Sequence, residues 1–202
     1  MIDWSKQKNY VVDEVFTSEQ IKYLKDLIAL APIDVIDDYN GRYLKGLDGK
    51  LRPDIIERTK QIAKEATGYD LVPADTGYSY YNNQYGKVEL HPHIDKNRTE
   101  FVIDYQLDGN VDWPIVIERK EFQLKDNQAL VFAGGEQPHW RPQREFVDGE
   151  YLGMIFFHFI APDHWTIVGG EDYKETPEWI NKKERAYQDY ASDWNKKQID
   201  FL

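Results

Sequence analysis

The sequence of 202 residues contains no cysteine. Disulfide bonds, thiolate metal sites and thiol nucleophiles are therefore excluded together. Any metal ion held by this chain must be bound mainly by histidine nitrogens and carboxylate oxygens. With five histidines in the whole chain, few positions can supply those nitrogens.

Basic residues and long apolar runs are also scarce. Lys and Arg number 25 against 36 Asp and Glu, giving a formal charge of −11. A field of that sign repels phosphate backbones, so nucleic acid is an unfavourable main partner unless a local basic patch overrides it. No segment reaches the ~18 apolar residues of a membrane span, and the N-terminus (1–6) has no apolar run typical of a signal peptide. The expected location is cytoplasmic.

What the chain does contain predicts a folded, mainly β protein of one domain with flanking helices. Hydrophobic residues make up 41% and aromatic residues 14%, enough for a substantial core. We expect three regions: an N-terminal strand and helices over 1–75, a β core over 76–162 and a C-terminal helical extension over 163–202.

The first region carries two clear helix signals. A strand is expected over 9–16, followed by a capping box in which Thr17 precedes Gln20 by three residues. The helix that follows should end before Pro32. A second helix is predicted over 53–67, with Pro53 in its first turn and Gly68 just past its end, and with Ile55, Ile56, Ile62 and Ala63 on its buried side. A short strand is possible at 35–36.

From residue 76 onward, short β-rich segments alternate with turn residues. Strands are expected over 77–82, 87–91, 99–107, 113–118, 121–124, 128–132 and 151–160. So many short strands in so few residues predict a closed antiparallel barrel or a jelly roll. Beyond this core, Thr176 and Pro177 predict the start of a helix that extends to about Trp194. That helix could be a lid over the site or a dimer contact.

Within the β core, His93-Ile94-Asp95 closes one predicted strand and His139 follows a Gly-Gly turn. Residues i and i+2 of a strand project to the same side, so His93 and Asp95 can both face the interior. With His139 they form the pattern of a two-histidine, one-carboxylate facial triad, which holds Fe(II) and leaves three positions open. His91 is the rival for the first position, or a substrate-facing residue. We expect His158 to be a satisfied buried histidine and His164 to be peripheral.

Several motifs together resemble the 2-oxoglutarate- and Fe(II)-dependent oxygenases, most closely their prolyl-hydroxylase-like branch. The resemblance covers roughly residues 76–160 and rests on the segments 80–86, 90–95, 113–115, 126–132 and 139–141. It implies a double-stranded β-helix (jelly-roll or cupin-like) fold, with Fe(II), the co-substrate 2-oxoglutarate and O₂ as reactants. It also implies hydroxylation of an unactivated C–H bond with release of succinate and CO₂. By position, His93, Asp95 and His139 would be the iron ligands.

One feature of that family is missing. Its members place an Arg or Lys on the last strand to pair with the C5 carboxylate of 2-oxoglutarate, whereas residues 148–151 here are Asp-Gly-Glu-Tyr and no basic residue follows before Lys174. A buried carboxylate without a cation is costly, so another donor must serve. The candidates are Arg141 first, Arg144 second and then Arg98, with Tyr80, Tyr81, Tyr105 or Gln106 as additional donors.

Two other readings stay open. A cupin-like metalloenzyme could use a similar barrel and histidine set without 2-oxoglutarate. A non-catalytic barrel could bind a carbohydrate or peptide through its many Tyr and Trp side chains, but would leave the three candidate ligands unexplained. The compact chain favours a small molecule, a free amino acid or a short peptide as substrate. The oligomeric state is left open.

Overall fold

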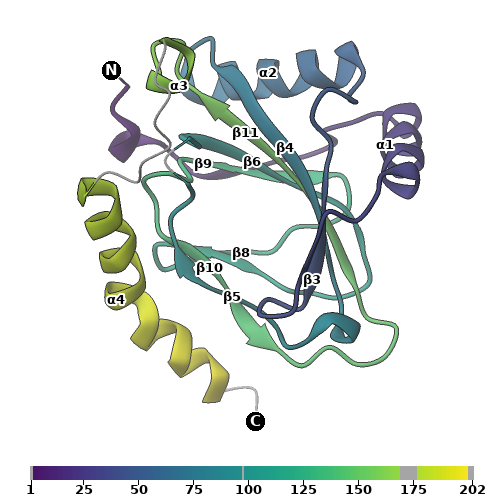
Figure 1. Ribbon diagram of the computed structural model, residues 1–202, viewed down its shortest axis with the longest axis vertical. Coiled ribbons are helices and arrows are strands. Elements are labelled where there is room, and N and C mark those ends of the chain that lie inside the picture. Colours follow the sequence, from purple (N-terminus) through teal and green to yellow (C-terminus); the bar gives the residue numbers. More distant parts are fainter. Residues whose placement is uncertain (1, 97, 169–176, 200–202) are drawn as a thin grey trace.

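The computed structural model describes residues 2–96, 98–168 and 177–199, and its centre is a pair of antiparallel sheets that face each other (Figure 1). The larger sheet has the strand order β1 (Tyr10–Val12), β9 (Gln128–Phe132), β6 (Phe101–Gly109), β11 (Leu152–Ile160), β4 (Val72–Tyr81), β3 (Arg42–Gly46) and β2 (Val35–Asp37). The smaller sheet has the order β5 (Val88–His93), β10 (His139–Arg144), β7 (Ile115–Ile117) and β8 (Lys120–Phe122). From β4 to β11 the chain passes back and forth between the sheets, which confirms the predicted double-stranded β-helix.

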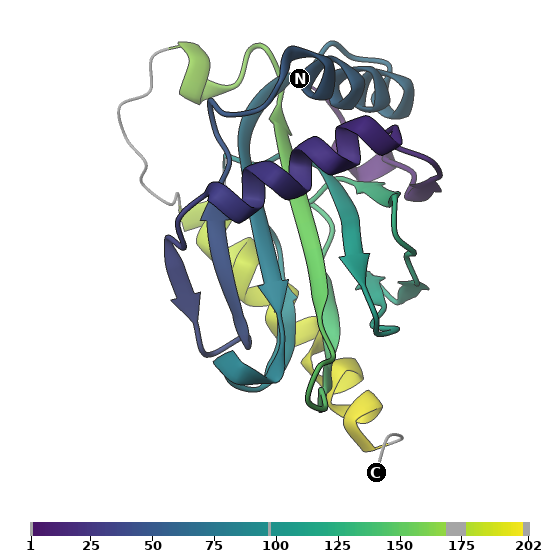
Figure 2. The same ribbon diagram turned by 90° about the vertical axis from the view of Figure 1, so that its right-hand side faces the viewer.

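Two helices cover the outer face of the larger sheet (Figure 2). Helix α1 (Ser18–Leu30) begins with the predicted capping box between Thr17 and Gln20, and α2 (Pro53–Thr67) ends at Gly68, whose φ of 79° is the left-handed conformation that glycine adopts most easily. Both boundaries are confirmed. The buried face of α2 was wrong at one position, because Ile56 is 36% exposed and Thr59 is buried instead.

The central strands of the larger sheet bury both faces, as β11 shows. Ile155, Phe157 and Phe159 pack into the cluster that includes residues of α1 and α2. Leu152 and Met154, of the opposite parity, pack into a second cluster between the sheets. Each fully buried side chain of this size contributes about 1.5–3 kcal/mol through the hydrophobic effect.

Helix α4 (Pro177–Ile199) lies along the outer face of the smaller sheet, against β5 and β10 (Figure 1). Trp194 and Tyr190 pack there with Trp140 and Val116. Because Trp140 points out of the sheet, this contact is on the side away from the space between the sheets. Thr176, the predicted cap of this helix, lies outside the described residues.

The remaining described helices are short: 3₁₀ turns at Trp4–Lys6 and Asn83–Tyr85, and α3 (Trp165–Val168). Across the described ranges, none of the helices has both the length and the apolarity needed to span a bilayer.

Candidate metal centre and cavity

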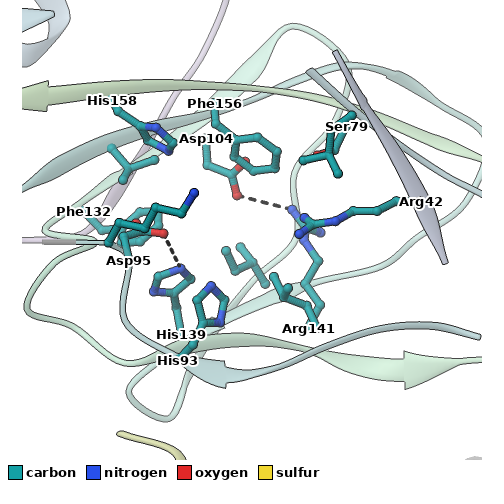
Figure 3. A pocket seen from close by; sticks show the side chains of 15 residues that line it. Arg42, Ser79, His93, Asp95, Asp104, Phe132, His139, Arg141, Phe156 and His158 are labelled. Carbon is teal, nitrogen blue, oxygen red and sulfur yellow. Dashed lines mark hydrogen bonds and ion pairs between the residues drawn. The ribbon is translucent and has the colours of Figure 1, made fainter. Parts of the chain in front are cut away.

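Three predicted ligands meet between the two sheets. His93 ends β5 and His139 begins β10, and these two residues are direct partners in the antiparallel ladder. Asp95 follows β5 by two residues. One donor atom from each of the three side chains can be chosen so that all three atoms lie within 4.8 Å of one another. Figure 3 shows the three side chains converging at one side of the cavity.

Backbone carbonyls fix which nitrogen of each histidine faces the centre. The Nδ1 of His93 lies 2.7 Å from the carbonyl of His91, and the Nδ1 of His139 lies 3.0 Å from that of Gln137. A carbonyl can only accept, so each Nδ1 carries the proton and each Nε2 keeps a free lone pair. Burial, and for His93 the neighbouring His139, lowers the pKa of His93 to about 3; burial lowers the pKa of His139 to about 4. Both rings are therefore neutral at pH 7.

Asp95 completes the set with an oxygen that has no protein partner. Its Oδ1 lies 3.7 Å from Nε2 of His139, while its Oδ2 is buried without a hydrogen bond. The backbone nitrogen of Asp95 donates to the carbonyl of Gly134 at 2.9 Å, and a Cβ at Gly134 would stand only 2.0 Å from Oδ2. Two free imidazole lone pairs beside an unsatisfied buried carboxylate oxygen fit a divalent metal ion.

The centre opens into a cavity of about 200 Å³ between the sheets. Its lining includes three cationic side chains, Arg42, Lys96 and Arg141, and two carboxylates, Asp95 and Asp104. The rest of the lining consists of Leu44, Ser79, Leu90, His93, Val102, Ile115, Phe132, His139, Phe156 and His158.

Arg141 lies fully inside the barrel because it follows His139 by two residues on β10. Its Nη1 donates to the carbonyl of Trp113 at 2.5 Å, and its Nη2 lies 3.4 Å from Oδ2 of Asp104. Burial raises the pKa of Asp104 to about 6, although the Arg141 charge opposes this. The other oxygen of Asp104 is buried without a partner.

Arg42 brings a second guanidinium group to the same end of the cavity (Figure 3). Its Nε donates to Asp37 at 2.9 Å and its Nη1 donates to the hydroxyl of Tyr81 at 2.8 Å. Among the described residues, its Nη2 has no hydrogen-bond partner. The Oγ of Ser79, on the neighbouring strand β4, is also buried without one. Unpaired donors and acceptors thus gather at this end, away from the three candidate ligands.

Comparison with known proteins identifies the fold. Neither a protein-family model nor a curated protein matches the chain. Among solved structures, HygX from Streptomyces hygroscopicus with nickel and 2-oxoglutarate bound has a TM-score of 0.62 at 9% identity over 87% of this chain and 91% of that one. A viral collagen prolyl hydroxylase from Paramecium bursaria Chlorella virus-1 has a TM-score of 0.58 at 8% identity over 79% and 98%. The α-ketoglutarate-dependent epimerase SnoN of nogalamycin biosynthesis has 0.60 at 12% over 78% and 79%. The fold is that of the 2-oxoglutarate- and Fe(II)-dependent oxygenases.

A guanidinium group of the smaller sheet approaches the last strand of the core, β11. Strand β11 has neither Arg nor Lys, but Nη2 of Arg141 lies 3.8 Å from the sulfur of Met154 on that strand. A guanidinium group carried by the smaller sheet therefore reaches the strand on which the family places its cation. Spacing along the chain could not show this, because it depends on how the two sheets face each other.

Of the predicted donors, Arg141 lines the cavity, and the other six do not: Arg98, Arg144, Tyr80, Tyr81, Tyr105 and Gln106. Arg144 bonds to Glu150 and to the carbonyl of Asp112 near the barrel rim. Tyr80 stacks on Tyr43 and Tyr151. Tyr105 packs against Phe16 in the cluster beneath the helices. Successive residues of a strand point to opposite faces. Ser79 on β4 and Asp104 on β6 line the cavity, so their neighbours Tyr80 and Tyr105 point away from it.

His91 does not lie where the sequence predicted. In a regular strand it would point to the same side as His93, into the cavity. The ladder pairs His139 with His93 but Arg141 with Leu90, so β5 uses three residues where β10 uses two. This bulge reverses the parity of β5. Leu90 consequently lines the cavity with His93, while His91 packs outside it between Tyr39 and Trp194.

His158 is held as predicted by a partner, yet it also lines the cavity. Its Nδ1 lies 2.6 Å from Oδ1 of Asp75. Burial disfavours the imidazolium, but the hydrogen bond to Asp75 and the charge of Asp95 outweigh burial and raise the pKa of His158. His164 contacts Thr166 and does not line the cavity, whereas Arg98 lies 3.7 Å from Asp75.

Four polar or charged residues of the cavity were missed from the sequence: Arg42, Ser79, Lys96 and Asp104. The sequence signal for two of them is the alternation of inward and outward side chains along a strand. Ser79 and Asp104 alternate with apolar residues on their strands, and a polar residue on the buried face of a strand is the mark of a site. Arg42 comes from a strand that had not been predicted, so no signal for it was available.

Proposed function

We propose that this chain is an Fe(II)- and 2-oxoglutarate-dependent dioxygenase that hydroxylates an unactivated C–H bond of a small molecule, amino acid or peptidyl residue. One observation carries the proposal. A two-histidine, one-carboxylate set with an unsatisfied Asp95 oxygen shares a cavity with a buried guanidinium group. The first feature suits Fe(II), and the second suits the distal carboxylate of the co-substrate.

His93, Asp95 and His139 would hold the metal through the two Nε2 atoms and the carboxylate. When bound, Fe(II) with 2-oxoglutarate and O₂ supplies the oxidising chemistry and releases succinate and CO₂. The protein contributes neutral, pre-oriented imidazoles that need lose no proton before they bind, and apolar walls at Val102, Phe132 and Phe156 that exclude water.

Arg141 is proposed as the anchor of the C5 carboxylate, with Arg42 and Ser79 adding donors at the same end. The guanidinium of Arg141 is rigidly held by Trp113, and this reduces the entropy lost when it binds an anion. The alternative of a cupin-like metalloenzyme that does not use 2-oxoglutarate was supported by the absence of a cation on the last strand. A buried Arg141 in the cavity removes that support.

The substrate class follows from size. A cavity of about 200 Å³ is below the ~300–1,000 Å³ of typical ligand pockets, so the co-substrate leaves room for only a small group beside the metal. HygX, a protein of similar fold, has been solved with hygromycin B bound. Since SnoN shows that this fold also serves an epimerase, the product must be analysed. A gain of one oxygen atom would support hydroxylation, and an unchanged mass would contradict it.

Arg141→Met tests the anchor. Loss of a charge-assisted hydrogen bond, worth roughly 1.5–3 kcal/mol, should weaken 2-oxoglutarate binding by roughly 10- to 150-fold. Binding is measured by anaerobic titration of the Fe(II) protein while the visible charge-transfer band is followed. Arg144→Met is the matched control, because it removes an arginine from the same strand outside the cavity.

Removing Arg141 leaves Asp104 buried beside no cation, which can destabilise the fold. The double variant Arg141→Met/Asp104→Asn avoids this problem and should bind 2-oxoglutarate as weakly as the single variant. Equal affinity in the parent and in a folded Arg141 variant would reject Arg141 as the anchor.

A further inference from the structure

Lys96 is a cationic side chain of the cavity that neither the metal nor the co-substrate explains. It follows Asp95 directly, is exposed to solvent, and still lines the cavity. Within the described ranges no direct hydrogen bond or ion pair joins its ammonium group to another residue, although its charge acts at longer range on the carboxylate of Asp75. It therefore stands at the solvent side of the candidate metal centre as a positive charge with no direct ion-pair partner.

His158 adds a directed polar group to the same cavity. Because Asp75 engages Nδ1 at 2.6 Å, the ring is held with Nε2 as its free nitrogen. The carboxylate of Asp75 also lies at ion-pair distance from this ring and favours its protonated form, in which Nε2 is a donor. Figure 3 shows His158 well separated from Arg42 and Arg141.

The cavity thus has two cationic ends with the candidate metal centre between them. The enclosed end, with Arg141 and Arg42, is the one proposed for 2-oxoglutarate. The open end has Lys96 and His158, and an apolar wall at Phe156 and Val102. The average field of a chain with a formal charge of −11 repels anions, so a lysine without a direct ion-pair partner at the cavity mouth gives this end a local charge of the opposite sign.

We propose that the open end binds an oxyanion of the substrate, so that the substrate is a small organic acid or an amino acid presented through its carboxylate. Lys96 supplies the charge and His158 the directed N–H. Fixing the carboxylate at these two groups would hold the neighbouring carbon chain against Phe156, beside the metal. This proposal rests on the proposed function for the identity of the metal and co-substrate, but Lys96 and His158 can be tested separately.

The experiment measures the binding of simple acids and their uncharged analogues. The protein is loaded with Ni(II) and saturated with 2-oxoglutarate, so that neither the metal nor the enclosed end is free. Dissociation constants are then determined by ligand-observed NMR for butyrate and butyramide, benzoate and benzamide, and N-acetylproline and its amide. We expect each acid to bind on the order of tenfold more tightly than its amide.

Variants assign that preference to residues. Lys96→Met should abolish it, Lys96→Arg should retain it, and His158→Gln should reduce it. Lys60→Met, which removes an exposed charge from α2, is the matched control and should leave it unchanged. Lys96 is exposed, so its variants should fold, and a urea midpoint equal to that of the parent verifies this.

Three results would overturn the proposal: acids that bind no better than amides, a preference that survives Lys96→Met, or a Lys96→Met variant that loses affinity for 2-oxoglutarate instead. The last would assign Lys96 to the co-substrate. If the parent protein fails to bind 2-oxoglutarate, the proposed function fails. The acid preference and its dependence on Lys96 would still be measurable in the same samples.

Discussion

His93 and His139 are prepared for a metal by their own backbone neighbours. Each ring donates Nδ1–H to a carbonyl two residues earlier in the chain, which leaves Nε2 unprotonated. Such orientation of a ligand by a hydrogen bond at its other nitrogen sharpens metal affinity. Both carbonyls belong to the strand or turn that positions the histidine, so the backbone fixes the place and the tautomer of each ligand together.

The same burial makes the metal-free protein sensitive to acid. An unfolded histidine has a pKa near 6.5, whereas His93 and His139 have values of about 3 and about 4 when folded. Below pH 6.5 the unfolded state therefore binds more protons, and each histidine lowers the free energy of unfolding by up to about 1.4 kcal/mol per pH unit. Asp104 acts in the opposite direction between pH 3.8 and 6, because its folded pKa of about 6 is raised.

His158, whose folded pKa is raised, also stabilises the fold as the pH falls and so acts in the same direction as Asp104. The contributions of His93 and His139 outweigh these two, so we expect urea unfolding in the presence of a chelator to show a net loss of stability from pH 7 to pH 5. His139→Gln should lose less over the same interval. An equal loss in the variant and in the parent would show that His139 is not buried in its neutral form.

At the scale of elements, the turn between β9 and β10 shapes the metal centre. Gly134 approaches Asp95 so closely that a Cβ would stand 2.0 Å from Oδ2 and 2.5 Å from a methyl of Val102. Gly134→Ala should therefore displace the carboxylate and weaken metal binding by at least tenfold, measured by Ni(II) titration. Gly77→Ala is the control, since its Cβ would meet nothing nearer than 4.0 Å. Unchanged affinity in Gly134→Ala would mean that Asp95 is not a ligand.

Helix α4 is attached to the smaller sheet by the aromatic side chains of Trp194 and Tyr190 and by an ion pair between Asp193 and Arg119. Trp194 is buried against Trp140 and His91, and its Nε1 donates to the carbonyl of Arg141 at 3.3 Å. Trp194→Ala should lower the free energy of unfolding by about 3 kcal/mol, as measured by urea denaturation. Tyr187→Ala, at a position that is 46% exposed on the same helix, should change it by less than about 1 kcal/mol. Equal effects would place the attachment of α4 elsewhere.

Element boundaries were predictable where local chemistry sets them. The capping box at Thr17 and the Pro53 and Gly68 pair of α2 act within a few residues, and all appear as predicted. Alternation along a strand gave the wrong side-chain direction where pairing with a strand distant in the sequence introduces a bulge. The bulge in β5 opposite β10 moved His91 out of the cavity, and Pro92, which a strand tolerates mainly at an edge or a bulge, was the sequence signal for it.

At the scale of the whole molecule, the candidate ligand set was predictable and most of the cavity was not. His93 and Asp95 are neighbours along the chain, and His139 stands out because the chain has few histidines. Arg42, Lys96, Asp104 and Arg141 come from four separate segments, and only Arg141 was a candidate beforehand. These four side chains line one cavity because of the way the two sheets pack against each other. The number and position of the predicted strands do not specify that packing.

A metal that bridges β5 and β10 joins two strands of the smaller sheet, so its binding should stabilise the whole fold. For a ligand that binds only the folded state, a free concentration of 100 times Kd adds about 2.7 kcal/mol. Chemical denaturation with and without Ni(II) should show a gain of this size in the parent and none in His93→Ala. A gain that persists in His93→Ala would place the metal elsewhere.

The central claim is that His93, Asp95 and His139 form an iron site that binds 2-oxoglutarate. Anaerobic addition of Fe(II) and 2-oxoglutarate to the metal-free protein, followed by visible absorption, tests it most directly. We expect a weak metal-to-ligand charge-transfer band in the parent that is absent from both His93→Ala and His139→Ala. Iron bound without a band, or a band that survives in either variant, would contradict the claim.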